Sequence, residues 1–297
     1  MVVSLMPAGV FVLYAYLLVR SGAWSGTVDL AAAVDFRVQD IVPVGLTAIM
    51  LALTLNPLQM GIIRFFEGYW GTSPLAIRLA HIRTLHHRRR IAELAGVDLV
   101  RSMDESEEVL NRVRFGESQR ALAGYPSELE MILPTRLGNV LRRYETAIGT
   151  PYGLNVLTSI PRLGMVASER EVAYVDNQRT QLELATRTSF LALAAVLVTL
   201  VLTWRDGPWM LFALLPYTVA FLAYRGSVTI AHEYGTSMAV MVDLSRFTLY
   251  ERMRLKLPET TEDERATNRR LSEFFEFSDR PVLEHDLPPA DGGTSRT

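Results

Sequence analysis

The sequence contains no cysteine among its 297 residues. Disulfide bonds, cysteine-ligated zinc sites, iron–sulfur clusters and thiol nucleophiles are therefore excluded. Lysine is almost as rare, because Lys256 is the only lysine among 30 basic residues. The net charge of −2 gives the chain no overall basic character, which argues against nucleic acid as a partner. A mean hydropathy of +0.16 together with 21% charged residues indicates apolar spans that alternate with charged segments.

Motifs that would indicate catalysis or metal binding are missing as well. The sequence has no G-x-S-x-G element, no Walker A loop and no G-x-G-x-x-G fingerprint, which argues against a hydrolase, an NTPase and a dehydrogenase of the usual folds. The histidines from His81 to His87 form the only cluster, and no carboxylate lies at metal-ligand spacing before Glu93. His232 with Glu233 lacks the second histidine of a zincin helix. We therefore expect no catalytic residue, no metal and no cofactor.

Four uncharged, apolar runs dominate the chain. They cover residues 1–19, 41–63, 188–204 and 207–224. The last two runs each reach about 26 Å as helices, which is just enough to cross a membrane. The first run has no early Arg or Lys, which argues against a secretory signal peptide. Buried helices of a soluble bundle would each show a polar stripe, whereas these runs are apolar all round, so they predict four transmembrane helices.

Basic residues are distributed unevenly about these runs. The stretches 20–40 and 205–206 hold three of the 30 basic residues, and the other 27 lie in 64–187 or after residue 224. By the positive-inside rule, both termini and the long middle segment are cytoplasmic. The sequence thus predicts a multi-pass protein of the cell inner (plasma) membrane.

Together these patterns predict an all-α protein with four transmembrane helices in two hairpins, long helical extensions and a helical cytoplasmic domain. The expected parts are a first hairpin over 1–64, a cytoplasmic helical domain over 65–187, a second hairpin over 188–225, cytoplasmic C-terminal helices over 226–277 and a disordered tail over 278–297. Nothing breaks the helical pattern from Ser168 to Trp204, which predicts one long helix. Thr261 and Glu264 predict a capping box at the start of the last helix.

Polar side chains are few within the runs, and none of them is ionisable. That argues against a proton-coupled transporter or a voltage sensor. The candidates for lining a pore or kinking a helix are Thr47, Thr54, Asn56 and Pro57. Asn56 with Pro57 either breaks the second run and lines a pore, or marks a proline kink whose freed carbonyl group is satisfied by a neighbouring helix.

A basic amphipathic helix is predicted after the second run. Ser73 is a suitable N-cap with Pro74 at the first helical position, and apolar residues recur at helical spacing from Leu75 to Leu85. The basic side chains around this stripe are Arg78, His81, Arg83, Arg88, Arg89 and Arg90. Such a helix either lies on an anionic membrane surface or packs its stripe on the cytoplasmic domain, and both alternatives stay open.

Four arginines lie among glycines and prolines further along the chain: Arg136, Arg142, Arg143 and Arg162. They indicate either a site for an anionic ligand or a partner's acidic face, or a solvated helix face.

Five short blocks of the sequence stand out. They are "FFEGYWG" (65–71), "LPTRLGN" (133–139), "YGLN" (152–155), "VDNQRTQLEL" (175–184) and "VDLSRFTLYERMRLKLP" (242–258). These blocks resemble those of an uncharacterised family of bacterial multi-span membrane proteins, typical of high-GC genomes. The resemblance covers most of the chain from about residue 40. It implies a multi-span topology, and it implies no reaction, cofactor or catalytic residue.

These observations favour a non-enzymatic integral membrane protein that forms homo-oligomers and carries a cytoplasmic scaffold or sensor domain. The alternative is an oligomeric ion channel or a membrane-perturbing effector, in which several subunits would enclose the pore. A membrane-bound enzyme would need convergent titratable groups near the histidine cluster or the pair His232 and Glu233. The expected partners are the lipid bilayer, further copies of the chain and a cytoplasmic protein.

Overall fold

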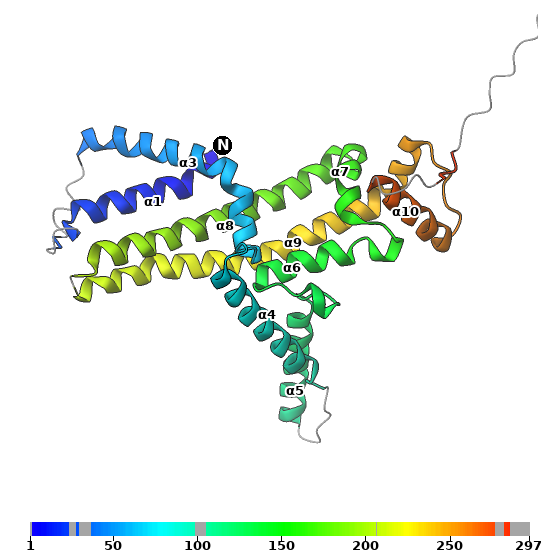
Figure 1. Ribbon diagram of the computed structural model, residues 1–297, viewed down its shortest axis with the longest axis horizontal. Coiled ribbons are helices and arrows are strands. Elements are labelled where there is room, and N and C mark those ends of the chain that lie inside the picture. Colours follow the sequence, from blue (N-terminus) through cyan, green and yellow to red (C-terminus); the bar gives the residue numbers. More distant parts are fainter. Residues whose placement is uncertain are drawn as a thin grey trace, which may run out of the picture. The chain divides into compact units, whose positions relative to one another are not determined.

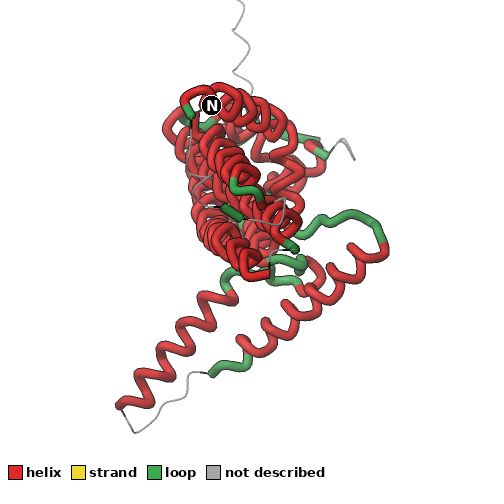
Figure 2. Tube along the Cα trace, turned by 90° about the vertical axis from the view of Figure 1, so that its left-hand side faces the viewer, coloured by secondary structure: helices red, strands yellow, loops and turns green. Residues whose placement is uncertain are grey.

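The computed structural model describes residues 2–23, 28–29, 37–98, 105–205, 207–276 and 282–285. Within these residues the chain is helical and holds no β-strand, as Figure 2 shows. The only extended pairing in this part is an isolated antiparallel bridge between Leu255 and His285. The predicted all-α fold is thus confirmed for the described part of the chain. Of the predicted disordered tail, 278–297, all but residues 282–285 lies outside the described residues.

Nine α-helices are present in this part of the chain. They are α1 (Val2–Arg20), α3 (Val38–Glu67), α4 (Pro74–Ala95), α5 (Glu105–Leu122), α6 (Arg136–Ala147), α7 (Val156–Val166), α8 (Glu169–Thr203), α9 (Leu214–Met253) and α10 (Thr261–Phe275), with 3-10 turns η2 (Leu129–Met131), η3 (Thr150–Tyr152) and η4 (Gly207–Ala213) between them. The long helix expected from Ser168 to Trp204 is α8. The capping box expected at Thr261 was wrong by one residue. Thr260 is the N-cap of α10, because its hydroxyl accepts a hydrogen bond from the backbone N–H of Asp263 over 3.2 Å.

Three of these helical stretches are long and apolar enough to cross a membrane. They are α3, α8 and the stretch Gly207–Met253, which joins η4 to α9. The first predicted span lies on α1, whose apolar part, Leu5–Arg20, is shorter. Asp206, in the turn that joins the third and fourth runs, lies outside the described residues.

The chain forms two compact units. Unit 1 comprises residues 1–85, 133–138 and 179–231, and unit 2 comprises residues 86–132, 139–178 and 232–297. The boundaries fall inside α4, α6, α8 and α9, so each of these helices contributes residues to both units.

In unit 1, α8 lies against the other apolar helices (Figure 1). A hydrogen bond of 2.7 Å joins the hydroxyl groups of Tyr14 on α1 and Thr199 on α8. Ser189 on α8 donates to the carbonyl group of Ala220 on α9 over 3.0 Å. Helices α1 and α3 also pack against each other. These contacts make α8 the central helix of an apolar bundle.

Helix α3 changes direction in its second half (Figure 1). Pro57 explains the bend, because proline has no N–H group to bond to the carbonyl group of Leu53 and its ring clashes with the preceding turn. After the bend, Gln59 contacts α8, and the ring of Phe66 lies 5.8 Å from that of Tyr224 on α9. The second half of α3 therefore crosses α8 and then α9.

Unit 2 has a hydrophobic core of its own. Leu163 of α7, Val242 of α9 and Leu271 of α10 are fully buried in it. Helix α9 approaches α6 closely at Gly235, where a Cβ atom would collide with the ring of Tyr144. Glycine at this position therefore allows the two helices to pack.

Candidate functional site

A buried arginine joins α3 to α8 in unit 1. Arg187 exposes only 4% of its surface. Its Nε atom donates to Oε1 of Gln59 over 2.9 Å, and its Nη2 atom donates to Oδ1 of Asn56 over 3.2 Å. Gln59, which exposes 6%, donates in turn from Nε2 to the carbonyl group of Glu183 over 3.1 Å. Asn56, Gln59 and Arg187 are called the Arg187 cluster below.

Burial of a guanidinium group is costly unless its N–H groups find acceptors. Asn56 and Gln59 supply amide oxygens, which satisfy donors but carry no negative charge. The Arg187 cluster thus holds a buried guanidinium group on amide oxygens, within the electrostatic influence of the Glu183 carboxylate, where the charge-free run of α8 begins. An ionisable side chain buried at such a place in a membrane protein is a functional candidate by default.

Asn56 is the only member of this cluster among the predicted pore or kink residues. Thr47 and Thr54 lie on an exposed side of α3. Their hydroxyl groups donate to the carbonyl groups of Pro43 and Met50 on the same helix, over 2.8 Å in each case. The structure therefore brings Asn56 to α8 and leaves the two threonines on the outside of the bundle.

Sequence reasoning missed the role of Arg187 because a charge at the end of an apolar run is usually solvated. A signal for it was present in the second run. Asn56 and Gln59 are amides three residues apart, so they share one side of a helix. Two amides on one side of an apolar helix need a polar partner from a neighbouring helix.

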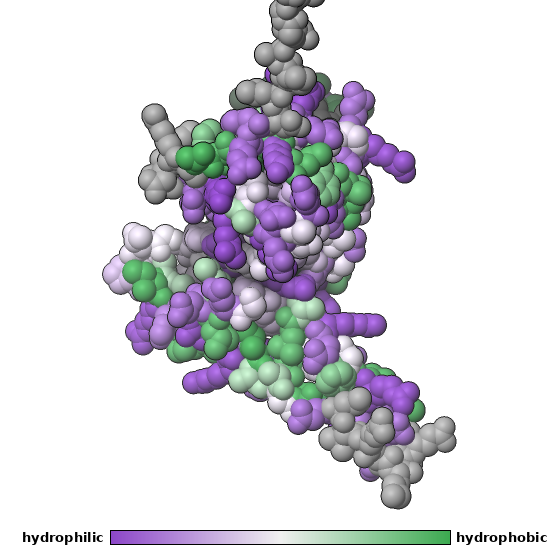
Figure 3. Space-filling model, turned by 90° about the vertical axis from the view of Figure 1, so that its right-hand side faces the viewer, coloured by the Kyte–Doolittle hydropathy of each residue, from purple (hydrophilic) through white to green (hydrophobic). Residues whose placement is uncertain are grey.

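The predicted basic helix is α4, and its apolar stripe is exposed. Leu75, Leu79 and Ile82 expose 69%, 47% and 52% of their surfaces, whereas Ala76 and Leu94 on another side are buried. The predicted basic residues are exposed too: Arg78, His81, Arg83, Arg88, Arg89 and Arg90. On α4 and α5, in the lower half of Figure 3, hydrophobic side chains lie at the surface among hydrophilic ones. The stripe is thus available to an external surface.

The histidines do not converge on a metal site. His87 is buried, and its Nδ1 atom lies 3.0 Å from the hydroxyl oxygen of Tyr125. The ring of His232 lies edge-on to that of Tyr144. In the part of the chain that the structure describes, no three His, Cys, Asp or Glu side chains are grouped so as to hold a metal ion.

The four arginines predicted as an anion or partner site have separate surroundings. Arg142 pairs with Glu145 over 3.2 Å along α6, and both side chains are partly buried. Burial of Glu145 raises the pKa of its carboxyl group, and the positive charge of Arg142 lowers it by less. Folding therefore disfavours the charged form of this carboxyl group.

The other three arginines differ in their surroundings. The guanidinium group of Arg162 lies 3.9 Å from the ring centroid of Phe275, in a cation–π contact. That of Arg143 lies over the ring of Tyr144 at 5.4 Å. Arg136 is exposed at the start of α6.

Further polar contacts fasten α9 within unit 2. The hydroxyl group of Tyr152 donates to Asp243 over 2.7 Å, and this hydrogen bond raises the pKa of Tyr152. Arg246 donates to Glu264 of α10 over 2.9 Å. These pairs tie η3 and α10 to α9, so they stabilise the fold of unit 2.

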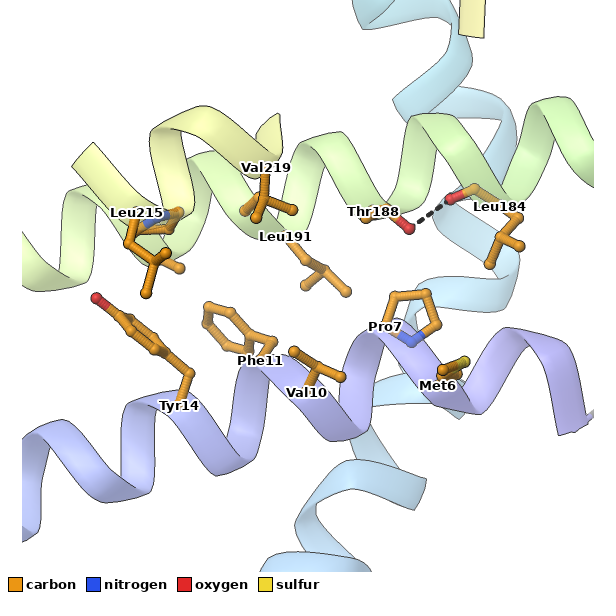
Figure 4. Close-up of a pocket in the computed structure, with 13 residues that line it drawn as sticks. Met6, Pro7, Val10, Phe11, Tyr14, Leu184, Thr188, Leu191, Leu215 and Val219 are labelled. Atoms are coloured by element: carbon orange, nitrogen blue, oxygen red, sulfur yellow. Dashed lines mark hydrogen bonds between the residues drawn. The ribbon is translucent and has the colours of Figure 1, made fainter. Parts of the chain in front are cut away.

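An apolar cavity of about 380 Å³ lies between α1, α8 and α9 in unit 1 (Figure 4). Side chains of α1 from Pro7 to Phe11 face Leu191 of α8 and Val219 of α9 across it. Thr188, at its edge, donates its hydroxyl proton to a carbonyl group of its own helix over 2.8 Å. The lining therefore suits a hydrocarbon chain better than a charged ligand.

No family model, no curated protein and no solved structure matches this chain. The described part of the chain offers three local features of its own: a buried guanidinium group with amide partners, an apolar cavity and an exposed amphipathic helix.

Proposed function

We propose that this chain is a non-enzymatic, multi-pass membrane protein that forms homo-oligomers and carries a helical scaffold domain beside the membrane. The observation that carries the proposal is the continuity of α8 and α9. Each of these helices runs without a break from the apolar bundle of unit 1 into unit 2, which has its own hydrophobic core. Two such helices attach a folded domain directly to the bundle.

Large apolar side chains on the surface of unit 1 support insertion into a membrane. Leu197 and Val201 on α8 expose 65% and 70% of their surfaces, and Leu222 on α9 exposes 60%. Full burial of one such side chain is worth about 1.5–3 kcal/mol. Extended apolar surfaces on a folded protein mark contact with a membrane or a partner. Hydrocarbon around unit 1 would remove this surface from water.

In this proposal both termini and unit 2 are cytoplasmic, and unit 1 lies in the inner (plasma) membrane. The uneven distribution of basic residues, with 27 of the 30 in 64–187 or after residue 224, supports this orientation. Helix α1 is taken as a fourth span because the hydrogen bond between Tyr14 and Thr199 holds it against α8.

The absence of cysteine makes a labelling experiment free of background. Single cysteines are introduced at Arg205, between the last two apolar runs, and at Ser127 and Glu259, all of which are exposed. A membrane-impermeant maleimide should label Arg205→Cys in intact cells, and the other two variants only after permeabilisation. Labelling of Ser127→Cys in intact cells would show that the orientation in the membrane is the opposite of the proposed one. Recovery of the chain as a soluble particle without detergent would refute membrane insertion.

The channel alternative has one observation in its favour. Thr47 and Thr54 are seven residues apart on the exposed side of α3, so several copies of α3 could present them to a shared axis. Mass measurement of the detergent-solubilised particle and ion flux into liposomes separate the two functions. The scaffold proposal expects an oligomer that conducts no ions. Ion flux that is abolished by Thr54→Leu and left intact by the exposed control Thr218→Leu would show that the protein is a channel and not a scaffold. A monomeric particle would refute oligomerisation.

A further inference from the structure

We propose that the second half of α3 and the first half of α4 form one docking surface for a bilayer that contains anionic lipids. This inference rests on the membrane insertion of unit 1 proposed above. The docking surface comprises the apolar side chains Leu75, Leu79 and Ile82 with the basic side chains Arg64, Arg78 and Arg83 beside them, all exposed.

The bend at Pro57 sets the course of the second half of α3. Gln59 contacts Arg187 on α8, and Phe66 contacts Tyr224 on α9. Arg187 precedes the apolar run of α8, and Tyr224 is the last residue of the uncharged run of α9. A helical segment that crosses two spans at the ends of their apolar runs follows the membrane surface and does not pass through the membrane.

A short connection holds the start of α4 at the same level. Only residues 68–73 separate the end of α3 from Pro74. Tyr69 and Trp70 lie in this connection, and Trp70 donates from Nε1 to the carbonyl group of Phe65 over 2.9 Å. Tyrosine and tryptophan are enriched at the level of lipid headgroups. The connection is therefore suited to the membrane surface, and it brings α4 there.

Apolar side chains are exposed on both sides of this connection, on α3 and on α4. Leu58 and Met60 in the second half of α3 expose 52% and 57%, and Leu75 at the start of α4 exposes 69%. All three lie within unit 1. A bilayer can cover both exposed parts, whereas a protein partner would have to displace lipid from the part on α3.

The charge of α4 selects anionic lipid. Residues 74–85, the part of α4 that lies in unit 1, contain Arg78 and Arg83 and no aspartate or glutamate. Each arginine near an anionic membrane surface strengthens binding by about fivefold. Arg78 and Arg83 flank the apolar stripe, so their side chains can reach headgroups while the leucines enter the acyl boundary.

The experiment uses the full chain in lipid nanodiscs with a single fluorophore at Leu79→Cys. Nanodiscs of phosphatidylcholine alone are compared with nanodiscs that also contain phosphatidylserine. Quenching by nitroxide-labelled lipid reports contact with the bilayer, and quenching by iodide reports exposure to water. Arg78→Gln/Arg83→Gln tests the charge, and Arg114→Gln/Arg120→Gln on α5 is the matched control, because all four arginines are exposed.

We expect nitroxide lipid to quench the fluorophore, and phosphatidylserine to increase this quenching. Arg78→Gln/Arg83→Gln should weaken the phosphatidylserine effect by about fivefold per arginine, and the control should leave it unchanged. Quenching by iodide alone, in a chain that enters nanodiscs, would overturn the docking surface and leave membrane insertion standing. Equal quenching in both lipid compositions would overturn the selection of anionic lipid. Failure to enter nanodiscs would overturn both proposals.

Discussion

Arg187 on α8 and Gln59 on α3 share a hydrogen bond of 2.9 Å, and each side chain is more than nine-tenths buried. The two residues are far apart in the sequence, yet they meet just after the point where Pro57 bends α3. Their contact sets the position along α8 at which the second half of α3 crosses this helix. The stability of unit 1 should therefore depend on this pair.

Gln59→Leu should destabilise the chain by about 1.5–3 kcal/mol, because it leaves the buried guanidinium group of Arg187 short of an acceptor. Unfolding by denaturant in detergent micelles measures the change. Thr54→Val on the exposed side of α3 is the control and should change stability by no more than about 0.5 kcal/mol. The double variant Gln59→Leu/Arg187→Leu should lose less than the sum of the two single variants. Equal changes in the free energy of unfolding for Gln59→Leu and Thr54→Val would contradict a stabilising role of the Arg187 cluster.

Two glycines of α9 should respond in opposite ways to alanine. At Gly235 a Cβ atom collides with Tyr144, whereas at Gly226 it meets no atom within 4 Å. Gly235→Ala should therefore cost about 1–3 kcal/mol through overpacking. Gly226→Ala should stabilise the helix by up to about 1 kcal/mol. Thermal unfolding of the two variants side by side tests the close approach of α6 to α9, and equal melting temperatures would argue against it.

Leu271 and Phe274 on α10 allow the effect of core packing to be compared with that of surface contact. Leu271 is fully buried and Phe274 exposes 43% of its surface. Leu271→Ala should reduce the free energy of unfolding by about 2–5 kcal/mol, because it opens a cavity in the core of unit 2. Phe274→Ala should have a clearly smaller effect, although it removes more atoms. If Phe274→Ala reduced the free energy of unfolding by more than Leu271→Ala, α10 would not be packed as described.

Glu145 should make the protein less stable as the pH rises. Burial raises the pKa of its carboxyl group above the ordinary value of 4.5. Between the unfolded and the folded pKa the carboxyl group of Glu145 binds more protons in the native state, so the contribution of this group to stability is greatest below about pH 4.5 and falls as the pH rises through the folded pKa. Glu145→Gln removes this dependence and should stabilise the chain at neutral pH, despite the loss of the ion pair with Arg142.

Unfolding measured at neutral and at acid pH tests this prediction. The advantage of Glu145→Gln should shrink as the pH falls from neutral towards about 4.5 and should be lost below that, where the carboxyl group of Glu145 is protonated in both the folded and the unfolded state. A variant that is less stable than the parent at neutral pH would show that the pairing with Arg142 outweighs the cost of burial.

Some features of this chain follow from local properties of the sequence. The prediction of one helix from Ser168 to Trp204 matches α8, because helical periodicity and the absence of Gly and Pro act within a few turns. The all-α fold follows in the same way. The exact start of α10 could not be predicted in this way, because Thr260 and Thr261 carry the same capping signal. The residue that becomes the N-cap is the one whose hydroxyl group reaches a backbone N–H group.

The position of Glu264 shows why local signals were insufficient there. Its carboxylate accepts from Arg246 on α9 over 2.9 Å, and the box expected with Thr261 does not form because Thr260 is the N-cap. Glu264 thus takes part in a contact between two helices that the local sequence pattern did not predict.

The sequence by itself determined the helices, their apolar runs and the side of those runs on which basic residues gather, because these depend on neighbours along the chain. Only the tertiary structure decided that Arg187 is buried with Gln59, that α3 turns across α8 and α9, and that the stripe of α4 is left exposed. Each of these depends on segments distant in sequence that meet in space. The free energy of such meetings comes from burial and hydrogen bonding between helices, which no local pattern specifies.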